Sequence, residues 1–401
     1  MTVSFMNSVI YLDHAATCRM RPEAIAAMTE AMEHTFGNAS PSYSIARDAK
    51  RCLDNARAVL AETIGAGWNE IVFTSGGTES DNWALTGTAE ALQDKGKHII
   101  VSAIEHHAIL HTCEYLESRG FSVTRLPVDS EGRVRPEELA DELNARPDTI
   151  LVSVMAANNE IGTLEDIGTL CRYTHDHGAL FHTDAVQAYG KTDALNVSAV
   201  PVDLFSASAH KIGGPKGIGF LYVRNGTRLQ SLIHGGSQER GRRAGTENVP
   251  AAAGFAAAAK AAFANMENET RAERELQAYF RERLLAAFGE RSGDSPAPSG
   301  ILWNGPVPGD DRLANNISVS FPGVSAESLL ISLDLAGICA SGGSACTTGA
   351  LDPSHVIMAV SGDRKRAEGT IRFTTGPENT KEEIDRTIEV LGEALRRIRT
   401  M

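Results

Sequence analysis

Short apolar runs alternate with longer helix-like stretches through the first two thirds of this 401-residue chain. Residues 150–154, Ile-Leu-Val-Ser-Val, are apolar at nearly every position, which is typical of a strand covered by helices on both faces. We predict strands at residues 71–74, 98–103, 121–126, 149–154, 179–183 and 202–207. The alternation predicts an α/β fold with a mainly parallel sheet.

The pattern changes near Pro250, where an Ala-rich and then charge-rich helical tract begins and continues to about Gly289. Its i,i+3 and i,i+4 apolar spacing predicts one long helix that connects two domains. Residues 292–308 are rich in Pro, Gly and Ser and are expected to form a loop. Shorter elements from Asn315 onward predict a smaller C-terminal α+β domain.

Composition excludes several classes of protein. The 51 acidic and 38 basic side chains give a net charge of -13, which argues against a broad nucleic-acid surface. The longest apolar tract, residues 249–259, is too short to cross a bilayer. The six cysteines form no C-x-x-C pair and the first 18 residues contain no Lys or Arg, so we expect a cytoplasmic protein without disulfides.

Lys211 lies directly after a predicted strand and before a glycine-rich turn, within Ser208-Ala-His210-Lys211-Ile-Gly-Gly-Pro. A lysine held in a partly dry cleft can react with an aldehyde as its neutral amine. Asp184 ends another predicted strand and could pair with a cation in the same crevice. Taken alone, Lys211 could be an ordinary loop lysine and Asp184 a helix cap.

The segment Thr74-Ser-Gly-Gly-Thr78-Glu-Ser follows a predicted strand and opens a helix, which could bind a phosphate group. No Walker sequence or early G-x-G-x-x-G occurs, which argues against ATP and NAD folds. A simple capped helix is the alternative. Pyridoxal 5′-phosphate requires a lysine, a carboxylate for its ring nitrogen and donors for its phosphate, and the chain offers a candidate for each.

Three histidines follow the strand at residues 98–103. A flat imidazole at His106 could stack on a cofactor ring, whereas His107 and His111 share a helix face and are expected at the surface. Zinc binding by His107 and His111 is the less favoured alternative, because H-E-x-x-H is absent.

Two further residues, Cys346 and Arg372, are candidate functional residues in the C-terminal part of the chain. Cys346 lies in the small-residue loop Ala340-Ser-Gly-Gly-Ser-Ala-Cys346-Thr-Thr-Gly, where an exposed thiol could be nucleophilic. Arg372, in a strand-like segment, suits a bidentate clamp on a carboxylate. The alternatives are an incidental cysteine and a solvated arginine.

Together, these segments resemble the NifS/IscS-like cysteine desulfurases, within the class V aminotransferase group of fold-type I pyridoxal phosphate enzymes. The resemblance covers nearly the whole chain. It is carried in order by Tyr11-Leu-Asp-His-Ala-Ala-Thr, Thr74-Ser-Gly-Gly-Thr-Glu-Ser, Asn158-Asn-Glu-Ile-Gly, Phe181-His-Thr-Asp-Ala-Val-Gln, Ser208-Ala-His-Lys, Arg243-Ala-Gly-Thr, Gly343-Ser-Ala-Cys and Ile371-Arg-Phe.

The resemblance implies roles for individual residues. Lys211 would form the Schiff base, Asp184 would pair with the pyridine nitrogen, His106 would stack on the ring, Arg372 would bind the substrate carboxylate and Cys346 would attack the substrate sulfur. The other cofactor-binding residues implied are Gln187 and Asn159 near the ring hydroxyl, with Asn159 also near the substrate, and Thr78, Ser208, His210 and Thr246 around the phosphate. Thr246 would come from the neighbouring subunit of a homodimer.

The implied reaction removes sulfur from L-cysteine, giving L-alanine and a persulfide on Cys346 that is passed to an acceptor protein. The implied domains are a large cofactor-binding domain at residues 16–260 and a small one formed by residues 1–15 and 261–401. A class V aminotransferase or lyase with an incidental Cys346, and a non-catalytic sulfur-relay scaffold, are the alternatives. The acceptor could serve iron-sulfur cluster assembly, tRNA thiolation or DNA phosphorothioation.

Overall fold

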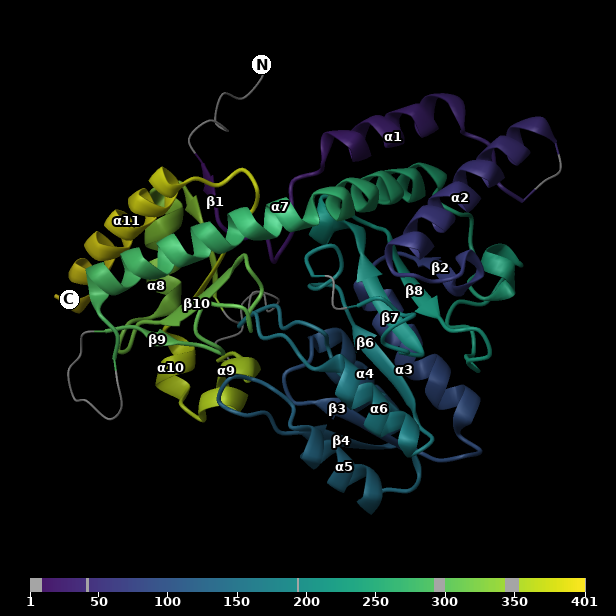
Figure 1. Ribbon diagram of the computed structural model, residues 1–401, viewed down its shortest axis with the longest axis horizontal. Coiled ribbons are helices and arrows are strands. Elements are labelled where there is room, and N and C mark those ends of the chain that lie inside the picture. Colours follow the sequence, from purple (N-terminus) through teal and green to yellow (C-terminus); the bar gives the residue numbers. More distant parts are fainter. Residues whose placement is uncertain (1–8, 41–42, 193–194, 292–299, 343–352, 401) are drawn as a thin grey trace.

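A central seven-stranded sheet organises the larger part of the molecule in the computed structural model, which describes residues 9–40, 43–192, 195–291, 300–342 and 353–400 (Figure 1). The strand order is β2-β8-β7-β6-β5-β3-β4, and β8 runs antiparallel to both of its neighbours while the other neighbouring pairs are parallel. The strands are β2 (Ile71–Thr74), β3 (His98–Ser102), β4 (Ser122–Leu126), β5 (Thr149–Ser153), β6 (Leu180–Asp184), β7 (Leu204–Ser208) and β8 (Gly219–Val223). The predicted parallel α/β sheet is confirmed.

Helices cover both faces of this sheet. Helices α3 (Gly77–Leu92) and α4 (His107–Ser118) pack on one face, where Val72, Val101 and Leu204 are buried. The opposite face, with Val152, buries its apolar residues against α2 (Ser44–Thr63), α5 (Pro136–Ala145), α6 (Ile167–Asp176) and the start of α7. Because both faces are dry, five of the seven strands are buried at every position.

A second hydrophobic core surrounds a smaller sheet with the order β12-β13-β10-β9. Its strands are β9 (Leu302–Trp303), β10 (Asn316–Ser320), β12 (Ser341–Gly342) and β13 (Thr370–Thr374), and β1 (Ile10–Tyr11) pairs beside it with β11 (Ile338–Cys339). The helices of this part are α8 (Ala326–Leu335), α9 (His355–Ser361), α10 (Arg364–Glu368) and α11 (Lys381–Arg399). The division at residues 16–260 stays a prediction.

The long helix α7 (Val249–Phe288) crosses the molecule and takes part in both cores (Figure 1). Asn248 caps it, since its side chain accepts a hydrogen bond from the Ala251 N–H. Ala252 and Phe255 pack in the core of the large sheet, whereas Phe280 and Leu284 pack in the second core. α1 (Pro22–His34) lies along the first half of α7. Among the described residues, no helix combines the length and apolar character that crossing a bilayer requires.

Candidate active site

Most of the predicted site residues follow neighbouring strands of the large sheet. Strands β3, β5, β6 and β7 are consecutive in the order of the sheet and parallel. His106 and Asn159 follow β3 and β5. Asp184 ends β6 and is followed by Gln187, and Ser208 ends β7 and is followed by His210 and Lys211. The structure therefore brings these side chains to one edge of the sheet, where open α/β sheets bind ligands.

Lys211 lies on the short 3-10 turn η3 (Ala209–Ile212) that follows β7. Its Nζ donates hydrogen bonds to the main-chain oxygens of Ala15, at 2.6 Å, and Ala16, at 3.0 Å. The turn ends at Gly213, whose φ of 79° lies in the left-handed region that glycine favours. The N-terminal segment thus forms one wall beside the lysine.

Asp184 is the last residue of β6 and is almost fully buried. Its Oδ1 accepts a hydrogen bond from the Val186 N–H at 2.9 Å. Burial raises the pKa of the Asp184 carboxyl to about 6, and the nearby Lys211 ammonium opposes this shift. A buried carboxyl near a lysine at a strand end can hold a protonated ring nitrogen.

His106 caps α4 by accepting a hydrogen bond at Nδ1 from the Ala108 N–H at 3.1 Å. This contact fixes the ring and leaves Nε2 to carry the proton of the neutral form. Burial, followed by the Lys211 ammonium, lowers the pKa of His106 to about 4. The imidazole is therefore neutral near pH 7.

A glycine cradle lies where β2 meets the N-terminus of α3. Gly76 has φ 151°, and a Cβ built on it would lie 3.8 Å from the Ser208 Oγ. A Cβ on Gly77 would lie only 2.7 Å from a methyl group of Val186. Thr78 is exposed in the first turn of α3, so the helix N-terminus offers main-chain and hydroxyl donors beside Ser208.

Gln187 donates from Nε2 to the Ala15 main-chain oxygen at 2.9 Å, while its buried Oε1 has no hydrogen-bond partner among the described residues. His210 contacts the Thr17 hydroxyl through Nδ1 at 3.2 Å. Burial, with Lys211 and Lys216 nearby, lowers the pKa of His210 to about 4. His210 is thus a neutral hydrogen-bonding group near pH 7.

Arg372 reaches the site from β13 of the second sheet and is 3% exposed. Its Nη1 donates to the Asn159 main-chain oxygen at 2.9 Å, and its Nη2 donates to Asp13 Oδ1 at 2.7 Å. The buried Nε has no hydrogen-bond partner among the described residues. Arg372 is therefore a fixed cation that joins Asn159 to the N-terminal segment.

Sequence reasoning missed Asp13 as the carboxylate partner of Arg372. Asp13 lies inside the Tyr11–Thr17 motif, so its position was available, but only the three-dimensional pairing distinguishes it. Asp81 and Glu105 were also missed. Both are fully buried, and burial raises the pKa of each carboxyl well above its ordinary value. No periodicity separates such buried acids from solvated ones.

The remaining predictions concern residues away from this edge or outside the structure. Thr246 is exposed in the loop before α7. His107 stacks on His111 with ring centroids 4.9 Å apart and lies 4.7 Å from His355. Within the described ranges, no group of three His, Cys, Asp or Glu side chains could hold a metal ion. Cys346 lies outside the described residues.

Comparison with known proteins gives matches along nearly the whole chain. The aminotransferase class-V family matches residues 10–387. A cysteine desulfurase IscS of Methanosarcina thermophila is 46% identical over 399 residues, covering 100% of this chain and 95% of the relative. A solved NifS-like protein aligns with a TM-score of 0.88 and 35% identity, covering 97% of this chain and 99% of its own. A structure described as SspA in complex with cysteine aligns with a TM-score of 0.78 and 32% identity, covering 92% of this chain and 100% of its own.

Proposed function

The chain belongs to the class V aminotransferase family and is a cysteine desulfurase, and from this premise we propose that it holds pyridoxal 5′-phosphate at the carboxyl edge of the large sheet. The observation that carries the proposal is the convergence of Lys211 and buried Asp184 at neighbouring strand ends. The cofactor supplies an electron-withdrawing ring that weakens bonds at the substrate α-carbon.

The residues present fit this group. The Gln187 Oε1 is buried without a partner among the described residues, as expected of an atom reserved for a ligand. The cradle of Gly76 and Gly77 leaves space beside the Ser208 hydroxyl that a Cβ would reduce. Asp184 would hold the protonated ring nitrogen, His106 would cover the ring, and Asn159 and Gln187 would contact its hydroxyl. The phosphate would be held by Thr78, Ser208 and His210.

Three residues would act on L-cysteine. Arg372 would bind its carboxylate, with Asp13 and Asn159 fixing the guanidinium. The Lys211 Nζ would accept and return the proton of the α-carbon, close to the neutral His106 imidazole. The Cys346 thiolate would bond to the substrate sulfur, whose bond to carbon breaks, leaving a persulfide on Cys346 while the carbon skeleton leaves as L-alanine.

We also propose a homodimer in which Thr246 completes the partner's phosphate site. Thr246 is exposed, and Trp68, Leu232 and Ile233 are exposed apolar side chains near the same loop. The Arg240 guanidinium stacks on Trp68 at 5.6 Å and links these residues to the loop. Packing of a second copy of the chain against these side chains would remove their apolar surface from water.

The acceptor is proposed to be a protein that docks near the Cys346 loop. We propose the cytoplasm as its compartment, because the reaction needs reduced thiols and Cys18, Cys52, Cys113, Cys171 and Cys339 are free.

The test compares two variants of the purified protein. Cys346→Ala should keep the visible absorption of the cofactor and lose persulfide formation, whereas Lys211→Ala should lose the absorption that borohydride bleaches in the wild-type protein. Persulfide transfer by Cys346→Ala at the wild-type rate would contradict the role of the thiol. A wild-type protein that stays colourless with added cofactor would contradict the cofactor assignment.

A further inference from the structure

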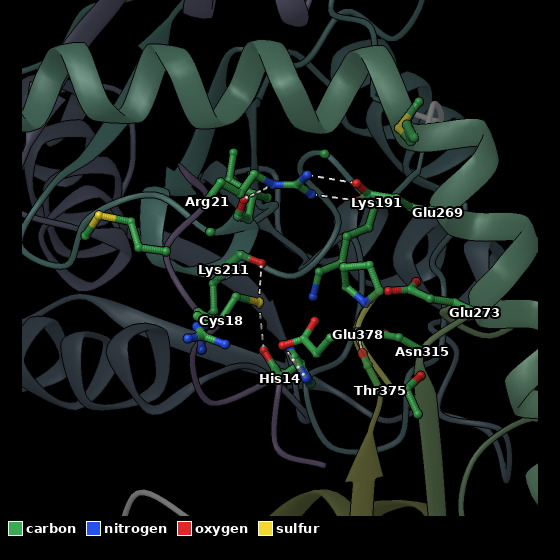
Figure 2. Close-up of a pocket in the computed structure, with 18 of the residues that line it drawn as sticks. His14, Cys18, Arg21, Lys191, Lys211, Glu269, Glu273, Asn315, Thr375 and Glu378 are labelled. Carbon is green, nitrogen blue, oxygen red and sulfur yellow. Dashed lines mark hydrogen bonds and ion pairs between the residues drawn. The ribbon is translucent and has the colours of Figure 1, made fainter. Parts of the chain in front are cut away.

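A cavity that is lined in part by Lys211 lies apart from Asp184, His106 and Gln187, none of which lines it. It has a volume of about 320 Å³ and is enclosed by the segment after β1, the second half of α7 and the loop after β13 (Figure 2). We call it the rear cavity. The lining side chains that bear on its ligand are His14, Cys18, Lys191, Glu273, Thr375 and Glu378, and the lining also includes Arg19, Arg21, Lys211 and Glu269.

Lys191 is one of the cations that line the rear cavity. The Lys191 Nζ is buried and has no hydrogen-bond partner among the described residues. Burying an ammonium group without a hydrogen bond is unfavourable. Within the described ranges, no anion satisfies the Lys191 ammonium group, and an anionic group of a ligand would do so.

Two other side chains that line the cavity have a buried atom without a hydrogen-bond partner among the described residues. Thr375 is 3% exposed, and its Oγ1 makes no hydrogen bond within the described ranges. His14 is 2% exposed, and its Nε2 makes no hydrogen bond there either, with Glu378 Oε1 at 3.7 Å. Buried side-chain polar groups in folded proteins are nearly always hydrogen-bonded, so a cluster of orphaned atoms around one hollow points to a missing ligand.

Acidic side chains also line the cavity: Glu269 and Glu273 come from α7, and Glu378 lies beside His14 (Figure 2). Glu269 is already used, since it accepts both terminal nitrogens of Arg21 at 2.8 and 2.6 Å. Glu378 lies 3.7 Å from His14 and its side chain is 46% exposed, whereas Glu273 forms no ion pair within the described ranges.

Burial raises the pKa of Glu273 to about 7, and the Lys191 ammonium opposes this shift. Lys191 therefore lies close enough to Glu273 to stabilise its carboxylate. Lys191 and Glu273 thus line one cavity and interact electrostatically, without a direct ion pair in the described part of the chain.

We propose that the rear cavity binds a small zwitterionic α-amino acid. Its carboxylate would lie against Lys191 and the Thr375 hydroxyl, and its ammonium group would lie between Glu273 and Glu378. An anion without an ammonium group would leave Glu273 without a cationic partner, and a cation without a carboxylate would leave Lys191 without an anionic one. The volume equals that of roughly ten water molecules, which suits one small amino acid with several ordered waters.

The wall of the cavity is joined to the backbone that carries Lys211. The Cys18 thiol donates to the Lys211 main-chain oxygen at 3.1 Å, and Arg21 Nε donates to the Ile212 main-chain oxygen at 2.9 Å. An amino acid bound here would rest against the turn η3. The ligand class includes the substrate and the product of the reaction, so the site would respond to their concentrations.

The experiment uses the purified full-length protein with its cofactor and titrates N-methyl-L-alanine by calorimetry. This probe is a zwitterion whose secondary amine forms no neutral imine with an aldehyde. We expect one equivalent to bind per subunit. Lys191→Met and Glu273→Gln should each weaken binding at least tenfold, because each removes one of the two recognising charges.

Matched substitutions on exposed residues of α7 serve as controls. Lys260→Met and Glu267→Gln remove the same charges outside the cavity and should leave binding unchanged. Arg372→Gln should also retain binding, which separates the rear cavity from the site at the sheet edge. Binding that is lost in Arg372→Gln but kept in Lys191→Met would overturn the proposal.

Two further measurements address ligand class and protein folding. Acetate and methylamine are titrated separately, and either one binding as tightly as the amino acid would show a simple ion site and overturn the zwitterion assignment. A crystal of the wild-type protein soaked with N-methyl-L-alanine should show the probe between Lys191 and Glu273, independently of how the variants fold. Density for the probe only beside Arg372 would refute the proposal.

Discussion

Replacing Glu239 by glutamine should destabilise the protein far more than most single substitutions, because it removes one charge from a buried ion pair. Arg57 and Glu239 have side chains that are each 3% exposed. Arg57 Nη1 and Nη2 donate to the two carboxylate oxygens at 2.6 and 2.8 Å, and the Phe73 N–H also donates to Glu239 Oε2 at 3.0 Å. Glutamine keeps the shape of the side chain but leaves the Arg57 charge uncompensated.

The expected cost follows from the geometry. At an effective dielectric constant of about 20, charges about 4 Å apart attract by about 4 kcal/mol. Removing one partner of a buried pair typically costs about 3–5 kcal/mol, and the two figures agree. Glu239 and Arg240 also hold left-handed backbone angles, with φ of 48° and 60°, which cost about 1–3 kcal/mol each and which the ion pair helps to maintain.

The assay is urea unfolding of the wild-type protein, Glu239→Gln, Arg57→Met and the double variant, followed by circular dichroism. Each single variant should lose about 3–5 kcal/mol of unfolding free energy, and the double variant should lose clearly less than their sum. Glu389→Gln is the control, since its pair with Arg386 is exposed and should contribute less than about 1 kcal/mol. If Glu239→Gln behaves like that control, the reasoning fails.

Three other substitutions test the site and the fold. Burial holds the pKa of Asp184 at about 6, so cofactor affinity of the cofactor-free protein should fall on the order of tenfold per pH unit below that value, and Asp184→Asn should remove this dependence in absorbance titrations. Gly219→Ala would place a Cβ 2.4 Å from the Ala207 main-chain oxygen, so it should cost about 1–3 kcal/mol in urea unfolding. A hydrogen bond to Asp203 raises the pKa of His175 to about 10, so its stabilisation is complete below about pH 6.5 and is lost as pH rises through about 10. His175→Gln should therefore cost about 1–2 kcal/mol at about pH 6 and little at about pH 10.5, and an equal cost at both values would contradict this assignment.

The predicted strands are confirmed, and most of them are apolar runs that the sheet buries. The exception is β4, of which only Leu126 is buried. Strand β2 has the predicted bounds, and β5 ends one residue earlier than predicted, at Ser153. The antiparallel strand β8 was not predicted. Its sequence, Gly-Phe-Leu-Tyr-Val, is as apolar as the parallel strands. Whether a strand runs parallel or antiparallel to its neighbour depends on the connection between them, which amino-acid composition does not reveal.

The position of the candidate site was predictable because residues at the carboxyl ends of parallel strands lie together at one edge of the sheet. Contacts between residues from distant parts of the chain could not be predicted. The contact of Asp13 with Arg372 joins residues 359 positions apart, and Arg57 meets Glu239 across 182 positions. The roles of Cys346 and Thr246 stay predictions.

The 40-residue helix α7 takes part in both hydrophobic cores, so its length fixes the distance between them and also their relative rotation about the helix axis. At 1.5 Å and about 100° per residue it extends about 60 Å, so one residue inserted near its middle would turn Phe280 and Leu284 by more than a quarter of a revolution. Arg372, which lies on β13, would then no longer reach the edge of the large sheet. A rod of this kind tolerates substitutions along its length far better than any change in the number of its residues.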